Sequence, residues 1–111
     1  MARRRVTFEV WHHQLRRQVC LWDGRRSTQT CSLSVFEDVA WYLQAHLGEG
    51  VTANGLWRSL PGAPRTQVHV ALGFLLTQGC LVRCGRRCCA TAPTLYEDAL
   101  SVFHELAAVG T

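Results

Sequence analysis

Residues 51–92, VTANGLWRSLPGAPRTQVHVALGFLLTQGCLVRCGRRCCATA, decide the fold of this chain. They predict a short helix, a tight turn, a longer helix and two short strands joined by a basic turn. The hydroxyl of Thr52 can accept a hydrogen bond from a backbone N–H in the first turn of the short helix. The Pro-Gly-Ala-Pro sequence at 61–64 breaks the chain, and its second proline suits the first turn of the longer helix, expected over 64–78. Gly79 then ends that helix.

The two strands are expected at 80–83 and 87–91. They can pair because β-prone residues flank a turn that contains Gly85. Arg86 and Arg87 would stand at the tip of this hairpin, and Pro93 would end its second strand.

Two further helices are expected, one on each side of this stretch. Ser34 and Glu37 form a capping box ahead of apolar residues that repeat at helical spacing over 35–47. Thr94 and Glu97 form a second box, and the helix that it opens, over 95–108, carries a wide apolar stripe. That stripe packs either on the core of its own chain or on a second copy.

Residues 5–30 are expected to form a small antiparallel meander, or one hairpin plus a loop. Val6, Phe8 and Val10 alternate with polar residues, which is strand periodicity. A second β-prone run covers 18–22, and the Asp-Gly pair at 23–24 is a strong hairpin signal. Residues 12–17 would form the first connection or a short helical turn. The tryptophans are expected to pack in the core, with Trp11 and Trp22 sealing the meander against a helix: Trp11, Trp22, Trp41 and Trp57.

Size and composition indicate one domain over 1–111. It would consist of a β extension (1–33), a helical core with a hairpin (34–92) and a C-terminal helix (93–111). Hydrophobic residues make up 48% of the 111 residues, which is enough for a core. No apolar run approaches the roughly 18 residues of a membrane span, and no apolar segment follows the basic start as in a signal peptide. With six cysteines and no secretory context, we expect reduced thiols and a cytoplasmic protein.

Charge is segregated along the chain. All twelve basic residues are arginine, and the formal net charge is +4. Residues 1–33 carry seven Arg against two acids, and 51–92 carry five Arg and no acid, so each segment has a net charge of +5. Residues 34–50 and 93–111 each carry three acids and no Arg, a net charge of −3. Such segregation favours an anionic partner.

The element order helix, helix, turn, helix, hairpin resembles the winged helix-turn-helix domains of prokaryotic regulators. The specific match is a run of aliphatic residues, an Ala-Leu pair and a glycine at fixed spacing: Val68, Ala71, Leu72, Leu75, Gly79, Cys80, Leu81 and Val82. The resemblance extends back to the helix at 35–47. It implies an α+β fold in which three helices and a β-hairpin wing are joined by the N-terminal β-meander or hairpin and the C-terminal helix.

The resemblance also implies that helix 64–78 is a recognition helix, whose N-terminal end enters the major groove of duplex DNA. The matching positions outside its core stripe begin with Arg65, which could reach a guanine edge or a phosphate. Thr66 could contact a phosphate or a thymine methyl group, and Gln67 could pair with adenine. His69 lies on the same side.

In the same resemblance, the wing over 80–91 follows the DNA backbone or the minor groove. Arg86 and Arg87 stand at its tip and Arg83 on the adjacent strand. The function implied is that of a DNA-binding transcriptional regulator that needs no cofactor. A homodimer could form through helix 95–108 or through the N-terminal strands, since palindromic operators bind dimers.

An alternative is a winged helix that binds a protein partner through Val70, Phe74 and the N-terminal meander and has no role on DNA. Val70, Gly73 and Phe74 fall on the outward face of helix 64–78, where DNA-reading helices usually carry polar residues. An exposed apolar patch there would favour this alternative.

The cysteines at 80, 84, 88 and 89 raise a third alternative, a thiol or metal sensor. Their spacing matches neither a zinc ribbon nor a ferredoxin, so we expect packed thiols and no metal, with Cys84 and Cys89 as the pair most open to oxidation. His12, His13 and Cys20 do not complete a catalytic set, because no acid lies at a useful spacing. No catalytic site is predicted, and the chain is not expected to be an enzyme.

Overall fold

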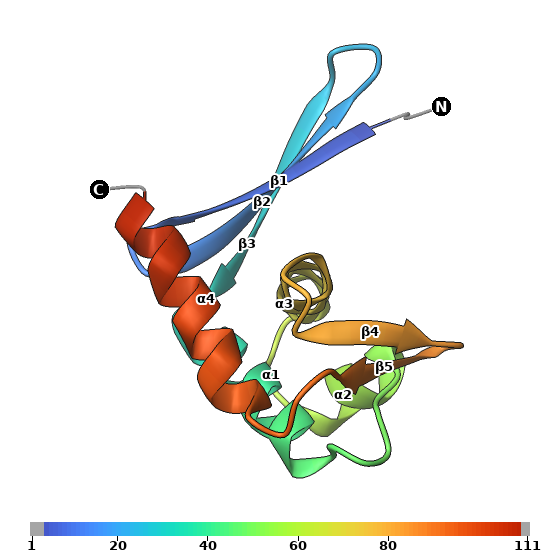
Figure 1. The fold of residues 1–111 in the computed structure, drawn as a ribbon. Coiled ribbons are helices and arrows are strands. Elements are labelled where there is room, and N and C mark those ends of the chain that lie inside the picture. The colour runs from blue at the N-terminus through green and yellow to red at the C-terminus, as the bar shows by residue number, and fades with distance from the viewer. Residues whose placement is uncertain (1–3, 110–111) are drawn as a thin grey trace.

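The computed structural model describes residues 4–109. This part of the chain is an α+β protein with two antiparallel sheets, one of three strands in the order β1-β2-β3 and one of two, β4-β5 (Figure 1). Its elements in chain order are β1 (Arg4–Trp11), β2 (Gln14–Leu21), β3 (Arg26–Ser32), α1 (Leu33–Ala45), α2 (Ala53–Ser59), α3 (Arg65–Thr77), β4 (Leu81–Cys84), β5 (Arg87–Ala90) and α4 (Leu95–Val109).

The N-terminal meander is confirmed, with all three strands present. The first connection is shorter than predicted, because β2 already begins at Gln14 and only His12 and His13 join it to β1. Both histidines have left-handed backbone conformations, with φ of 52° and 62°. Such a two-residue turn matches the twist of the paired strands. The helical turn considered for 12–17 was therefore wrong.

Helix α1 begins and ends earlier than the sequence predicts. Its N-cap is Ser32, whose hydroxyl accepts the N–H of Val35 at 3.2 Å, so the predicted capping box at Ser34 does not begin the helix. The helix ends at Ala45, and His46, not Gly48, forms the C-cap. β3 ends at Ser32 and α1 begins at Leu33, so no loop separates the strand from the helix.

The stretch from α2 to β5 follows the prediction closely. The Thr52 hydroxyl accepts the N–H of Gly55 at 3.0 Å and begins α2. Gly79 has a φ of 81° after α3, and the next N–H, of Cys80, donates to the carbonyl of Leu75 at 3.0 Å. This is the geometry by which a glycine ends a helix and satisfies its last carbonyls.

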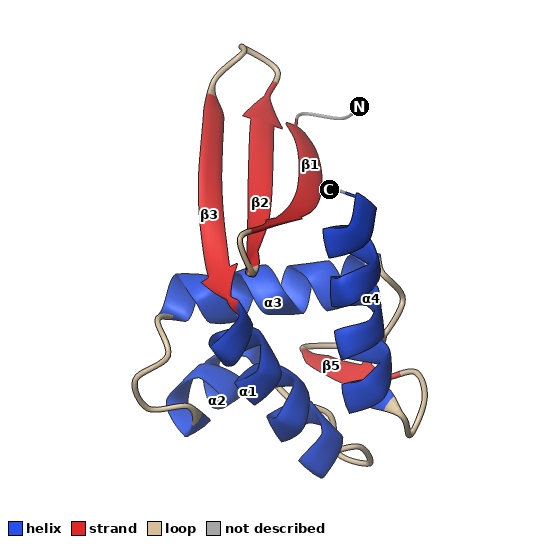
Figure 2. Cartoon of the chain, turned by 90° about the vertical axis from the view of Figure 1, so that its left-hand side faces the viewer, coloured by secondary structure: helices blue, strands red, loops and turns tan. Residues whose placement is uncertain are grey.

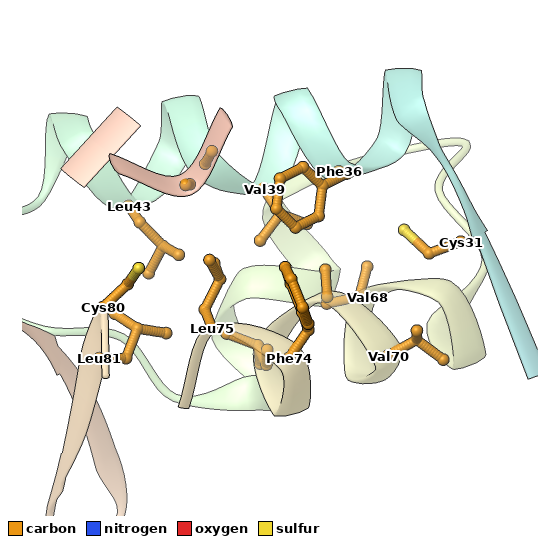
Figure 3. Packing of buried hydrophobic residues seen from close by; sticks show 14 of the residues in the cluster. Cys31, Phe36, Val39, Leu43, Val68, Val70, Phe74, Leu75, Cys80 and Leu81 are labelled. Carbon is orange, nitrogen blue, oxygen red and sulfur yellow. The ribbon is translucent and has the colours of Figure 1, made fainter. Parts of the chain in front are cut away.

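Helix α3 is buried on two adjacent sides, which meet at Phe74. Its inner side packs on α1, where Phe36 and Val39 face Phe74 and its neighbours (Figure 3). Its other side lies under the N-terminal sheet (Figure 2), and the ring of Phe8 lies 5.4 Å from that of Phe74. Val70 and Phe74 are therefore fully buried, which corrects the prediction that both face outward. The apolar patch required by the protein-binding alternative does not exist on this helix.

The tryptophans do not form the core. Trp11, Trp22 and Trp41 are 52%, 79% and 65% exposed, so the prediction that Trp11 and Trp22 seal the meander was wrong. Only Trp57, in α2, is packed against the core cluster. Phenylalanines take the central positions instead, since their rings carry no polar atom that needs a partner.

Helix α4 packs on α1 and on β1. Its buried residues are Leu95, Ala99 and Phe103, and the ring of Phe103 lies 5.1 Å from that of Phe36. Gln44 of α1 fastens the start of α4 by accepting the N–H of Tyr96 at 3.0 Å. The centre of the apolar stripe is thus covered within the chain. Within residues 4–109, no helix has both the length and the apolar character needed to cross a membrane.

The two-sided burial of Phe74 predicts a large stability loss for Phe74→Ala. The free energy of unfolding, measured by urea denaturation, should fall by about 3–5 kcal/mol, because the change leaves a cavity between the sheet and α1. The exposed Trp22→Ala serves as the control and should change stability by less than about 0.5 kcal/mol. A loss below about 1 kcal/mol for Phe74→Ala would mean that the sheet does not pack on α3.

Candidate nucleic-acid interface

The N-terminal sheet and the β4–β5 hairpin lie on either side of α3 (Figure 1). Residues of these three elements line a basic groove, with α3 as its floor. Its volume is about 660 Å³. The sheet contributes one wall, α3 the floor, and the hairpin with the start of α2 the other wall. The lining residues are Arg4, Val6, Phe8, Arg17, Val19, Ser27 and Gln29 of the sheet; His69, Leu72, Gly73, Leu76 and Thr77 of α3; and Ala53, Arg83, Arg86 and Cys88.

Strand alternation places Arg4 and Arg17 on the groove side of the sheet. Successive side chains of a strand point to opposite faces, so Arg4 shares its face with Phe8, which packs on Phe74. Arg17 pairs with Phe8 in the β1–β2 register and points the same way. Arg5 faces the opposite side of the sheet, where it lines a separate shallow hollow.

Arg17 is held in place from two sides. Its Nε donates to Oε1 of Gln29 at 3.0 Å, and its guanidinium reaches over Gly73 on the groove floor. Partial burial lowers the pKa of Arg17, and the nearby positive charge of Arg4 lowers it further. An arginine still keeps its charge at any physiological pH. The groove therefore holds two cations that repel each other.

Arg83 and Arg86 face these cations from the opposite wall. Arg83 belongs to β4, and Arg86 follows Gly85 in the turn, where a φ of 66° allows the tight reversal. No acid is found among the residues that line the groove. Within residues 4–109, the salt bridges join only Arg16 with Glu9 and Arg25 with Asp23. The four arginines of the groove thus have no carboxylate partner in the described chain.

His69 lies on the floor of the groove. Partial burial lowers its pKa, and the positive charges of Arg65 and Arg17 lower it further. Both effects disfavour the protonated imidazole in the free protein. An anion bound beside it would oppose these effects and favour the protonated ring.

Of the seven residues predicted to contact DNA, His69, Arg83 and Arg86 line the groove. Arg65 and Thr66 are exposed at the start of α3, outside it. Arg65 lies over the ring of Trp57, 5.3 Å from its centre, and donates to Asn54 at 3.2 Å.

Gln67 and Arg87 have partners elsewhere. The Oε1 of Gln67 accepts the N–H of Ser32 at 2.9 Å, which ties α3 to the junction of β3 and α1. Its side-chain oxygen, which the sequence predicts to pair with adenine, is thus engaged within the chain. Arg87 donates to the carbonyl of Gly50 at 3.3 Å and does not line the groove.

Sequence reasoning missed Arg4 and Arg17. The signal was present, since each belongs to a pair of adjacent arginines in a strand, of which one must face each side. Which member faces the core side follows only from the packing of Phe8 on α3.

The cysteines of the β4–β5 hairpin do not share one face. Cys84 and Cys89 lie on the same face of the hairpin and Cys88 on the other, as their register positions require. Burial raises the pKa of Cys31 to about 12, and it also raises the pKa of Cys80 and of Cys88. Among the described residues, His, Cys, Asp and Glu side chains form no group of three or more that could hold a metal ion.

Comparison of the chain with protein-family models, with curated proteins and with solved structures finds no match.

The burial of the thiols predicts a wide range of alkylation rates. Treated with iodoacetamide at pH 8, the exposed Cys84 should react first, while Cys31 should stay unmodified until urea unfolds the protein. Raising the pH to 10 should not make Cys31 react with iodoacetamide, because burial raises the pKa of its thiol to about 12. Peptide mass spectrometry measures both sites in one sample, and equal rates at Cys31 and Cys84 would contradict the packing of β3 on α3.

Proposed function

We propose that this protein binds nucleic acid through the basic groove, and that residues 34–92 are a winged helix with β4–β5 as its wing. The observation that carries the proposal is the convergence of Arg4, Arg17, Arg83 and Arg86 without an acidic partner. Guanidinium groups bind phosphate oxygens in bidentate fashion. A phosphate chain lying in the groove would be contacted from both walls.

The wing has the role in this proposal that the sequence predicts for it. Arg83 and Arg86 contact the nucleic-acid backbone, and His69 contributes from α3. Arg65 and Thr66 extend the same surface past the end of the groove. These contacts fix position and affinity; Gln67 makes no base contact in this proposal, because its side-chain oxygen is engaged by Ser32.

A role in transcriptional regulation, a homodimer and a cytoplasmic location belong to this proposal as further predictions. The protein-binding alternative is not proposed, since Val70 and Phe74 are buried.

The neighbouring residues Arg4 and Arg5 provide a matched test of the groove. Both changes, Arg4→Ala and Arg5→Ala, remove one charge from β1, but only Arg4 lines the groove. Arg4→Ala should weaken binding of a fluorescein-labelled oligonucleotide roughly tenfold and lower the slope of log affinity against log salt by about one unit. Fluorescence anisotropy at several salt concentrations measures both quantities.

Arg5→Ala should change affinity by less than about threefold, because only the long-range field is reduced. Equal losses in the two variants would mean that net charge alone drives binding. Absence of salt-dependent binding by the unchanged protein would refute the proposal itself.

Binding should also strengthen as the pH falls. The lowered pKa of His69 favours the neutral ring in the free protein, and a bound phosphate favours the protonated ring, so binding is accompanied by proton uptake at His69. Affinity should rise roughly threefold to tenfold between pH 7.5 and 5.5. His69→Gln should flatten this dependence, whereas the exposed His104→Gln should keep it.

The free protein should respond to pH in the opposite direction. Since the folded-state pKa of His69 lies below its ordinary value, the unfolded state binds more protons, and the free energy of unfolding falls as the pH drops below about 6.5. If affinity did not change with pH, or if His69→Gln left its pH dependence intact, His69 would not contact the ligand.

A further inference from the structure

We infer that the ligand of the basic groove is a single nucleic-acid strand, of DNA or RNA, and that the duplex is excluded from it. This inference rests on the proposed nucleic-acid binding and specifies the form of nucleic acid that fits.

The placement of α3 argues against insertion into duplex DNA. An α-helix about 10–12 Å across fills a major groove about 12 Å wide, so a recognition helix must project with both flanks free. One flank of α3 is covered here along its length, because Val70 and Phe74 lie under the sheet and Gln67 is bonded to Ser32. Inserting α3 would drive the sheet into the phosphate backbone beside the groove.

The chemistry of the groove matches what a single strand exposes. Its floor and sheet wall carry apolar surface from Val6, Phe8 and Leu76, between the arginines of the two walls. A duplex turns its phosphates outward and hides the faces of its bases. A single strand presents unstacked bases and phosphates together, so that bases can lie on apolar side chains while phosphates reach cations.

The size of the groove points the same way. Its volume of about 660 Å³ lies within the range of small-molecule pockets, roughly 300–1,000 Å³. Cations on both walls, Arg4 and Arg17 facing Arg83 and Arg86, line a space that takes a few nucleotides of one strand.

The decisive experiment compares labelled 12-nucleotide ligands of one sequence by fluorescence anisotropy at constant salt. The ligands are single-stranded DNA, single-stranded RNA, the blunt DNA duplex and a DNA strand whose central residues lack bases. At least one intact single strand should bind at least tenfold tighter than the duplex. Removal of the central bases should weaken DNA binding at least fivefold, because the apolar floor then has no partner. The difference between the DNA and RNA arms identifies the preferred strand.

Matched variants test whether the strand lies on the groove side of the sheet. Val6→Glu adds a carboxylate to the groove wall, and Thr7→Glu adds the same charge one residue on, to the opposite face. Val6 is 39% exposed, so the glutamate can be solvated without unfolding the protein, which thermal unfolding verifies. Val6→Glu should reduce single-strand affinity at least tenfold and Thr7→Glu less than threefold.

Tighter or equal binding of the duplex would overturn the inference and leave nucleic-acid binding standing. Equal binding of the strand with and without bases would also overturn it, since the groove would then be a general polyanion site. Binding of none of the ligands would overturn the proposed function as well.

Discussion

The packing of Phe74 between two layers is the constraint on which the rest of this structure depends. Its ring lies 5.9 Å from that of Phe36 in α1 and 5.4 Å from that of Phe8 in β1. A helix with one narrow apolar stripe could leave the rest of its surface to solvent or to DNA, but α3 buries six side chains (Val68, Val70, Ala71, Leu72, Phe74 and Leu75) and needs cover from a second element besides α1. The N-terminal sheet supplies the second cover. The sheet is thereby part of the core, and its position fixes one wall of the basic groove.

Most of the fold could be predicted because its signals are local. The structure contains three local signals that the sequence predicts: the Thr52 cap, the Pro-Gly break and Gly79. Each acts on residues only a few positions away along the chain. The errors occur where a distant contact decides. The left-handed turn at His12 and His13 is stabilised by tertiary structure, since the carbonyl of His13 accepts the N–H of Leu33 at 3.2 Å. Nothing in a His-His pair indicates such a turn.

Only part of the candidate site could be predicted, because its other residues are brought to the groove by long-range packing. Arg83 and Arg86 belong to the β4–β5 hairpin and His69 to α3, and both elements could be predicted from the sequence. Arg4 and Arg17 become visible only when the sheet is placed on α3, because alternation gives each strand two faces and does not say which one is buried. The same placement engages the side-chain oxygen of Gln67, which accepts a hydrogen bond from Ser32, 35 residues away along the chain. Long-range packing both adds and removes site residues.

The described residues that line the groove include no acid, which is a consequence of the fold and not of composition alone. The chain has enough carboxylates to pair most of its arginines, but six of the eight lie in segments 34–50 and 93–111, which contain α1 and α4. Neither helix contributes a residue to the groove. The two basic segments meet there instead, although like charges at close range raise the free energy of the folded state. Two-sided burial of α3 outweighs that repulsion and holds the cations together, and a polyanion bound between them would relieve it. The same layer that makes the helix stable thus makes the surface attractive to phosphate.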